Sequence, residues 1–170
     1  YGSTWHWAHY HHTLGKAGLL YAGHHPGSFE NDFENLAIYP GLKPATSYAR
    51  SGRYAVAAQP GETALLYQVP LANLGYPLPK TLSLEAWMLT PGPPGQDMSI
   101  DLQVMRRDTL LFSGSRAIDS AFRNNNTWTK VTWNYTIPDV NDTGLVLKMV
   151  MRNGGSQPLF TDDLTIGFSD

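Results

Sequence analysis

The sequence contains no cysteine among its 170 residues, so it has neither a disulfide framework nor thiolate chemistry. Charged side chains are also scarce, at 15% of the chain against roughly 25% in average domains. The net charge is −2, which gives no basic footprint for a nucleic-acid partner. No apolar run approaches the roughly 18 residues of a membrane span. We therefore expect neither a nucleic-acid partner nor a membrane span.

Small polar residues, glycine and proline take the place of the missing charges, a bias found in many extracellular β proteins. Hydrophobic residues make up 42% of the chain and aromatic residues 12%, which indicates a folded domain with a real core. The chain begins at Tyr1 rather than at methionine, so we expect it to be processed or cut from a longer protein. The composition predicts an extracellular protein, either secreted or held at the cell surface.

Two regions differ in composition. Residues 1–26 form a predicted irregular arm that is rich in tyrosine and tryptophan and contains all six histidines, four of them in a His-x-x-His-x-His-His cluster at His6, His9, His11 and His12. Such a cluster suits zinc, copper or nickel, or it packs with the arm on the domain or on a neighbouring subunit. Residues 27–170 form the predicted folded domain.

From Ser51 onward, apolar and polar residues alternate in short segments separated by Gly, Pro and Asn turns, and no segment has a capped helical period. This pattern predicts an all-β domain, an antiparallel two-sheet β-sandwich of the jelly-roll type. The predicted strands are Arg53–Ala58, Thr63–Val69, Thr81–Thr90, Met98–Arg106, Thr109–Ile118, Trp128–Ile137, Gly144–Arg152 and Phe160–Phe168.

The last predicted strand carries one residue that breaks its pattern. Phe160, Leu164, Ile166 and Phe168 share one parity, and Asp162 shares it with them, so the carboxylate is predicted to point inward. A bare carboxylate in a core costs several kcal/mol unless it is paired. The chain must therefore supply a cation, a set of N–H donors or a metal ion.

Three motifs resemble those of galactose-binding-like jelly rolls, in particular carbohydrate-binding modules of the xylan- and glucan-binding type. They are a Phe-Glu pair followed by residues 49–56 (ARSGRYAV), residues 128–132 (WTKVT) with 136–138 (TIP), and the closing residues 160–166 (FTDDLTI). The resemblance covers about residues 27–170. It implies a jelly roll that binds a polysaccharide or other glycan.

The resemblance also implies a structural calcium ion. Its ligands would be the Phe-Glu carboxylate, which is Glu30 or Glu34 here, the first aspartate of the closing pair, Asp162, and the backbone around Ser51 and Arg53. An acidic loop with oxygen ligands suits such a hard cation. The alternative is that Asp162 accepts backbone N–H bonds while both glutamates are solvated.

A glycan platform is predicted where aromatic and polar side chains share outward parity. The anchor is Trp87, which has the parity opposite to Leu84 and Met88 and so lies on the outward or concave face. The predicted ligand-binding set is Trp87, Glu85, Asp101, Gln103, Tyr67 and Trp128. The alternative is that Trp87 and Trp128 pack under loops or under the arm.

These observations favour an extracellular, non-catalytic carbohydrate-binding module with a structural calcium ion. The first alternative is a structural or adhesive β-sandwich subunit of a surface assembly or filament, with the arm docking on other domains or subunits. A third possible function is a glycan-active hydrolase or lyase, which would need a carboxylate pair such as Glu85 and Asp101 about 5–9 Å apart.

Overall fold

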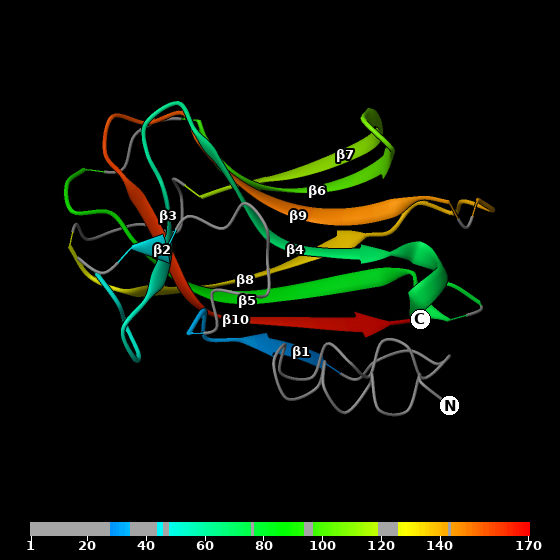
Figure 1. Cartoon of the computed structure of the whole chain (residues 1–170), viewed down its shortest axis with the longest axis horizontal. Coiled ribbons are helices and arrows are strands. Elements are labelled where there is room, and N and C mark those ends of the chain that lie inside the picture. Colours follow the sequence, from blue (N-terminus) through cyan, green and yellow to red (C-terminus); the bar gives the residue numbers. More distant parts are fainter. Residues whose placement is uncertain are drawn as a thin grey trace.

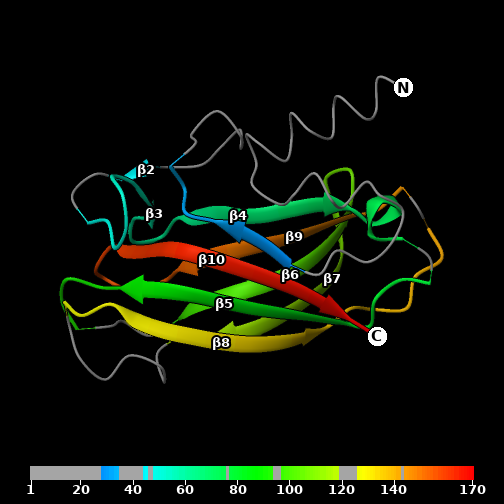
Figure 2. The same cartoon turned by 90° about the horizontal axis from the view of Figure 1, so that it is seen from below.

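The computed structural model is a sandwich of two antiparallel β-sheets, as predicted (Figures 1 and 2). The structure describes residues 28–34, 44–45, 48–75, 77–93, 97–118, 126–142 and 144–170. The predicted arm and all six histidines lie outside the described residues. Within the described part of the chain, no helix has the length and apolarity needed to cross a membrane.

The first sheet has the strand order β2-β3-β10-β5-β8, and β1 also pairs with β10. Because β3 pairs with the start of β10 and β1 with its end, the last strand of the chain organises this sheet. Its strands are β1 (Ser28–Asn31), β2 (Pro44–Ala45), β3 (Ala55–Ala58), β5 (Thr81–Leu89), β8 (Thr129–Thr136) and β10 (Leu159–Ser169).

The second sheet has the order β4-β9-β6-β7. Figure 1 shows that β6 and β9 rise toward the left and that the β6–β7 hairpin rises at the right, so the outer face of this sheet is concave. A short 3₁₀ turn, Leu71–Leu74, follows β4. The strands are β4 (Thr63–Pro70), β6 (Met98–Arg106), β7 (Thr109–Ala117) and β9 (Val146–Asn153).

All eight predicted strands are present, each within about two residues of its predicted ends. The two missed strands, β1 and β2, span only four and two residues. Segments that short carry no alternating pattern, and they are strands only because distant partners pair with them.

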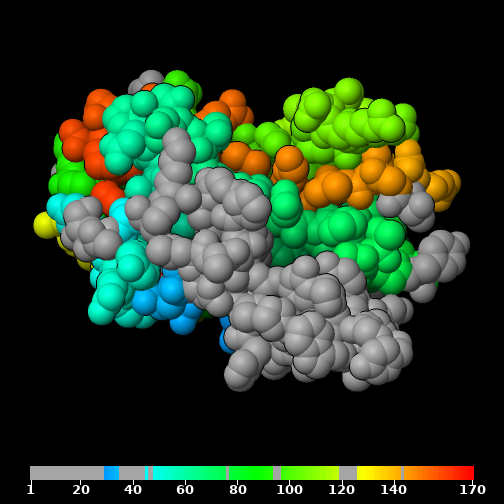
Figure 3. All heavy atoms as spheres, viewed as in Figure 1, coloured from blue at the N-terminus to red at the C-terminus, as the bar shows by residue number. Residues whose placement is uncertain are grey.

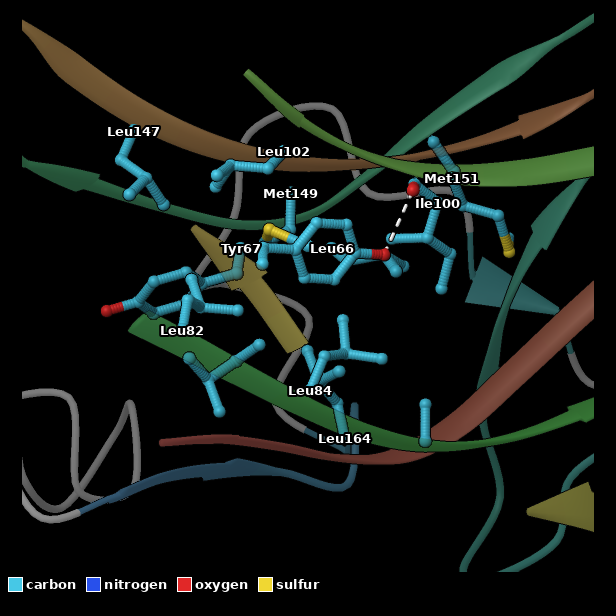
Figure 4. Packing of buried hydrophobic residues seen from close by; sticks show 14 of the residues in the cluster. Leu66, Tyr67, Leu82, Leu84, Ile100, Leu102, Leu147, Met149, Met151 and Leu164 are labelled. Carbon is cyan, nitrogen blue, oxygen red and sulfur yellow. Dashed lines mark hydrogen bonds between the residues drawn. The ribbon is translucent and has the colours of Figure 1, made fainter. Parts of the chain in front are cut away.

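The core fills the space between the sheets. Tyr67 lies there among Leu66, Leu82 and Met149 (Figure 4). The Tyr135 hydroxyl donates a hydrogen bond of 3.0 Å to the carbonyl of Ile100. Burial raises the pKa of this phenol, and Arg116 offsets part of the rise. The bond joins β8 to β6 and so connects the two sheets through the core.

A bulge in β10 separates the face on which Asp162 lies from the face of Leu164 and Ile166. Register with β5 pairs Asp162 with Trp87 but Thr165 with Glu85, so one residue is inserted between them. Asp163 has a φ of 49°, a conformation that Asp tolerates better than most residues. Inserting one residue reverses which face the following side chains occupy. Asp162 therefore lies on the outward face with Trp87, and the prediction that it points into the core is wrong.

The same bulge divides the apolar residues of β10 between two clusters. Leu164 and Ile166 lie in the main core, as predicted. Phe160 lies on the outward face in a second cluster with Ala57 and Leu89, where Ala45, Tyr48 and Trp128 pack against it. The segment that includes Tyr48 thus covers one end of the first sheet's outer face.

Candidate functional site

The predicted ligand residues do not form one platform. Trp87 and Glu85 lie on the outer face of the first sheet, because Leu84, Ala86 and Met88 of the same strand point into the core. Asp101 and Gln103 lie on the outer face of the second sheet. Strands β5 and β6 are consecutive in sequence but belong to different sheets. A platform or acid pair that joins Glu85 to Asp101 is therefore not assembled.

The other two predicted ligand residues are packed into the protein. Tyr67 is buried in the core, with its ring centroid 4.8 Å from that of Phe29 and 6.3 Å from that of Phe168. Trp128 packs against the second hydrophobic cluster. Neither side chain lies beside Trp87 on an open surface, and Trp128 follows the predicted alternative of packing within the protein.

On the first sheet, the outward tryptophan has a protein neighbour over its ring. The Arg50 guanidinium carbon lies 3.8 Å from the Trp87 ring centroid, a cation–π contact. Arg50 also pairs with Asp163, with Nη1 and Oδ2 2.5 Å apart. The Lys130 ammonium lies 2.8 Å from Glu85 Oε1. Around Trp87, the cations of this face are therefore paired with carboxylates of the chain.

Asp162 lies beneath the loop that carries Arg50 and is completely buried. Its Oδ2 accepts the backbone N–H groups of Arg50 at 2.8 Å and Ser51 at 3.1 Å. Its Oδ1 accepts the N–H of Asp163 at 2.8 Å. Burial raises the pKa of this carboxyl, and the three N–H bonds offset part of the rise. Of the three kinds of partner expected, the N–H donors are present.

Glu34 contacts the same loop further along the chain. Its Oε1 accepts the backbone N–H groups of Arg53 and Tyr54, both at 2.8 Å. Gly52 lies between these donors and Ser51 with a φ of 58°, and a Cβ built on it would lie 2.4 Å from Glu34 Cδ. Only glycine leaves room for the carboxylate at this point.

Glu30 and Glu34, the two candidates for the Phe-Glu calcium ligand, have different surroundings. Glu30 lies in the β1–β10 ladder opposite Thr165, whereas Glu34 and Asp162 both contact the loop 50–54. Glu34 Oε2 and Asp162 Oδ1 keep lone pairs beyond the bonds described above. The described residues contain no cluster of three His, Asp or Glu side chains that could hold a metal. A calcium ion here would take its other oxygens from the backbone or water, and it stays a prediction.

The concave outer face of the second sheet is the other candidate site, and we call it the concave face. Figure 3 shows the outline of the molecule hollowed between the β3–β4 side and the β6–β7 hairpin. Strand register places its side chains in rows across all four strands. The rows are Thr63, Arg152, Ser99 and Ala117; Leu65, Val150, Asp101 and Ser115; Gln68, Lys148, Gln103 and Ser113; and Pro70, Val146, Met105 and Leu110.

Asp101 is the centre of a hydrogen-bond network on this face. It is buried although it points outward, with 1% of its surface exposed. Its Oδ1 accepts the hydroxyls of Ser99 at 2.9 Å and Ser115 at 2.7 Å, and its Oδ2 accepts an N–H of Arg152. The Arg152 side chain is 54% exposed. A buried carboxylate therefore fixes a guanidinium whose other N–H groups have no acceptor among the described residues and could bind a ligand.

Sequence reasoning missed four of these residues: Ser99, Ser115, Lys148 and Arg152. The outward parity of Lys148 and Arg152 was visible, because they alternate with Leu147, Met149 and Met151 in a predicted strand. Parity gives only the face of a strand. Which strands adjoin β6, and hence which cations lie near Asp101, depends on sheet order.

No protein-family model matches the chain, and no curated protein matches it. Solved structures do match. The tandem CBM22-1–CBM22-2 domain of Paenibacillus barcinonensis Xyn10C aligns with a TM-score of 0.55 at 18% identity, over 83% of this chain and 50% of that one. The CBM22-2 xylan-binding domain of the same protein aligns with a TM-score of 0.51 at 14% identity, over 88% and 96%.

A family 16 carbohydrate-binding module aligns with a TM-score of 0.49 at 14% identity, over 81% of this chain and 89% of that one. At these identities, the two matches to Xyn10C domains establish the fold. The chain thus has the jelly-roll fold of carbohydrate-binding modules, and the predicted resemblance is confirmed at that level.

Proposed function

We propose that this domain is a carbohydrate-binding module and that a polysaccharide binds along its concave face. The observation that carries the proposal is the Asp101 network, which holds the Arg152 guanidinium in place on a concave sheet. Neighbouring amide and hydroxyl groups, including those of Gln103 and Ser113, provide further hydrogen-bonding partners for sugar hydroxyls. The shared fold with xylan-binding domains supports the same function.

The experiment is isothermal titration of the domain with a panel of neutral and acidic polysaccharides, using wild type and Asp101→Asn. The substitution removes the charge that holds Arg152 but keeps a hydrogen-bond acceptor for a serine hydroxyl. We expect binding to weaken at least tenfold, since hydrogen bonds to charged groups contribute about 1.5–3 kcal/mol and about 1.4 kcal/mol is tenfold in affinity. The proposal fails if the wild type binds no polysaccharide, or if Asp101→Asn binds as tightly as the wild type.

The proposal includes a structural calcium ion at Glu34 and Asp162. The support is that both carboxylates contact one loop and keep acceptor capacity toward a cation. A bound ion would neutralise a buried charge there and tie the loop 50–54 to β10. We prefer Glu34 to Glu30 because Glu34 contacts the loop 50–54, whereas Glu30 lies in the β1–β10 ladder opposite Thr165.

The proposal also places the domain outside the cell and without catalysis of its own. Its low charge and its richness in small polar residues support an extracellular location. The predicted acid pair, Glu85 and Asp101, lies on the outer faces of different sheets, and this arrangement does not suit glycoside hydrolysis. The assay is release of reducing sugar from every polysaccharide that binds, and sustained release would overturn this part.

A further inference from the structure

We infer that the glycan bound on the concave face is anionic and that Lys148 and Arg152 recognise its carboxylate or sulfate groups. The inference rests on the proposed function and adds the chemical class of the ligand. It depends on which charges the concave face exposes, which it conceals, and where the aromatic rings lie.

The exposed charges of the concave face are positive. Among the side chains in its four rows, the charged ones are Lys148, Arg152 and Asp101. Asp101 is buried and accepts three hydrogen bonds, one of them from Arg152. The carboxylate is therefore hidden from a ligand, whereas the two cations remain. A concave surface that exposes one sign of charge concentrates the field and attracts the opposite sign.

Lys148 is a cation without a counter-charge among the described residues. It is half-buried between Gln68 and Gln103 in its row, and no ion pair joins it to any described residue. On the other outer face, Lys130 is paired with Glu85. An ammonium that is partly desolvated and unpaired gains from an anionic ligand more than a solvated, paired one does.

The spacing of the two cations suits a polymer. Lys148 and Arg152 are four residues apart on β9 and share its outer face, so their Cα atoms lie about 13 Å apart along the strand. A chain lying along β9 would present anionic groups of different sugar units to the two cations.

Aromatic rings lie elsewhere among the described residues. Neutral sugars are commonly held by stacking on exposed rings, but the rows of the concave face contain none. The outward tryptophan, Trp87, is on the first sheet with the Arg50 guanidinium against its ring. The described part of the concave face therefore offers charge-assisted hydrogen bonds and no aromatic ring for stacking. This combination suits an anionic glycan better than a neutral one.

The test is titration calorimetry with chemically matched polymers. Polygalacturonate is compared with its fully methyl-esterified form, dextran sulfate with dextran, and poly-glutamate serves as a polyanion without sugar. We expect polygalacturonate or dextran sulfate to bind at least tenfold more tightly than its neutral counterpart, and the tighter of the two identifies carboxylate or sulfate. Raising the salt concentration should weaken this binding.

Substitutions locate the binding. Lys148→Gln should weaken it about tenfold, whereas Lys130→Gln, which removes the same charge from the other outer face, should leave it unchanged. Arg152→Lys keeps the charge but loses the planar fork, so it should weaken binding less than Arg152→Gln. Thermal melts of each variant check that the domain is folded.

Each contrary result has its own meaning. If neutral polymers bind as tightly as anionic ones, the inference fails while the proposed function stands. If no polysaccharide binds, both fail. Equal binding of poly-glutamate, or equal weakening by Lys130→Gln and Lys148→Gln, overturns the inference because the attraction would then be unspecific.

Discussion

Asp162 and Asp101 are both buried carboxylates on outward-pointing positions, yet their partners differ. Asp162 accepts three backbone N–H groups beneath a loop, and that loop shields it from solvent. Asp101 accepts side-chain donors, one of which, Arg152, is itself more than half exposed. Backbone partners fix the position of a chain segment, whereas side-chain partners leave donors at the surface. We therefore propose a structural role for Asp162 and a ligand-binding role for the Asp101 network.

The largest expected effect is that of Asp162→Ala on stability. Three backbone N–H groups would lose their acceptor, and each unsatisfied buried group costs about 1–3 kcal/mol, so we expect a loss of about 3–5 kcal/mol. Urea unfolding measures it. Asp163→Asn is the control, because Asn tolerates the same backbone conformation and the main chain of residues 50 and 51 keeps its acceptor. A loss below 1 kcal/mol for Asp162→Ala would contradict the structural role.

Calcium removal tests the same site in another way. An ion bound only to the folded state stabilises it by about 2.7 kcal/mol at a hundredfold excess over its dissociation constant. Chelator should therefore lower the melting temperature of the wild type. Glu34→Gln should reduce this response, whereas Glu30→Gln should not. Identical melting curves with and without chelator would leave the N–H donors as the only partners of Asp162.

A smaller effect is expected for Trp87→Ala. The ring is partly exposed and has Arg50 against it, so we expect a stability loss of about 1–2 kcal/mol, less than the about 3–5 kcal/mol of a fully buried ring. Glycan affinity, measured by titration, should be unchanged. Weaker glycan binding at unchanged stability would show that the glycan binds on the first sheet, beside Trp87, and not beside Asp101.

The smallest effect concerns the support beneath the concave face. Tyr135→Phe removes the hydrogen bond to the Ile100 carbonyl, beside Asp101, and should destabilise the domain by about 1 kcal/mol. Because the bond lies in the core, glycan affinity should change less than twofold. A strong loss of affinity would show that the position of β6 depends on this hydroxyl.

The alternative function, a structural or adhesive subunit, depends on the predicted N-terminal arm, which lies outside the described residues. Deleting residues 1–26 leaves every described strand in the chain. If the arm mediates assembly, light scattering should show a change of oligomeric state on deletion. A monomer before and after deletion would remove this alternative.

The sequence predicted the strands well because alternation is local. It could not assign strands to sheets, and for this reason Glu85 and Asp101 seemed able to meet. The face of Asp162 was mispredicted because one inserted residue, Asp163, reverses the alternation in β10. Asp162 does need partners, but the reason is that the loop carrying Arg50 and Ser51 covers it on the outward face, not that parity places it in the core. Its partners include the N–H groups of Arg50 and Ser51, which are more than a hundred residues away in the sequence. Only the fold reveals them.

The most direct test of the central claim is an NMR titration of the labelled domain with the polysaccharide that binds most tightly. We expect amide shifts to change in Met98–Arg106 and Val146–Asn153, on the concave face. Thr81–Leu89 and Thr129–Thr136, on the first sheet, should be unaffected. Shift changes confined to these two strands of the first sheet would contradict the account, because they would place the ligand beside Trp87 instead of Asp101.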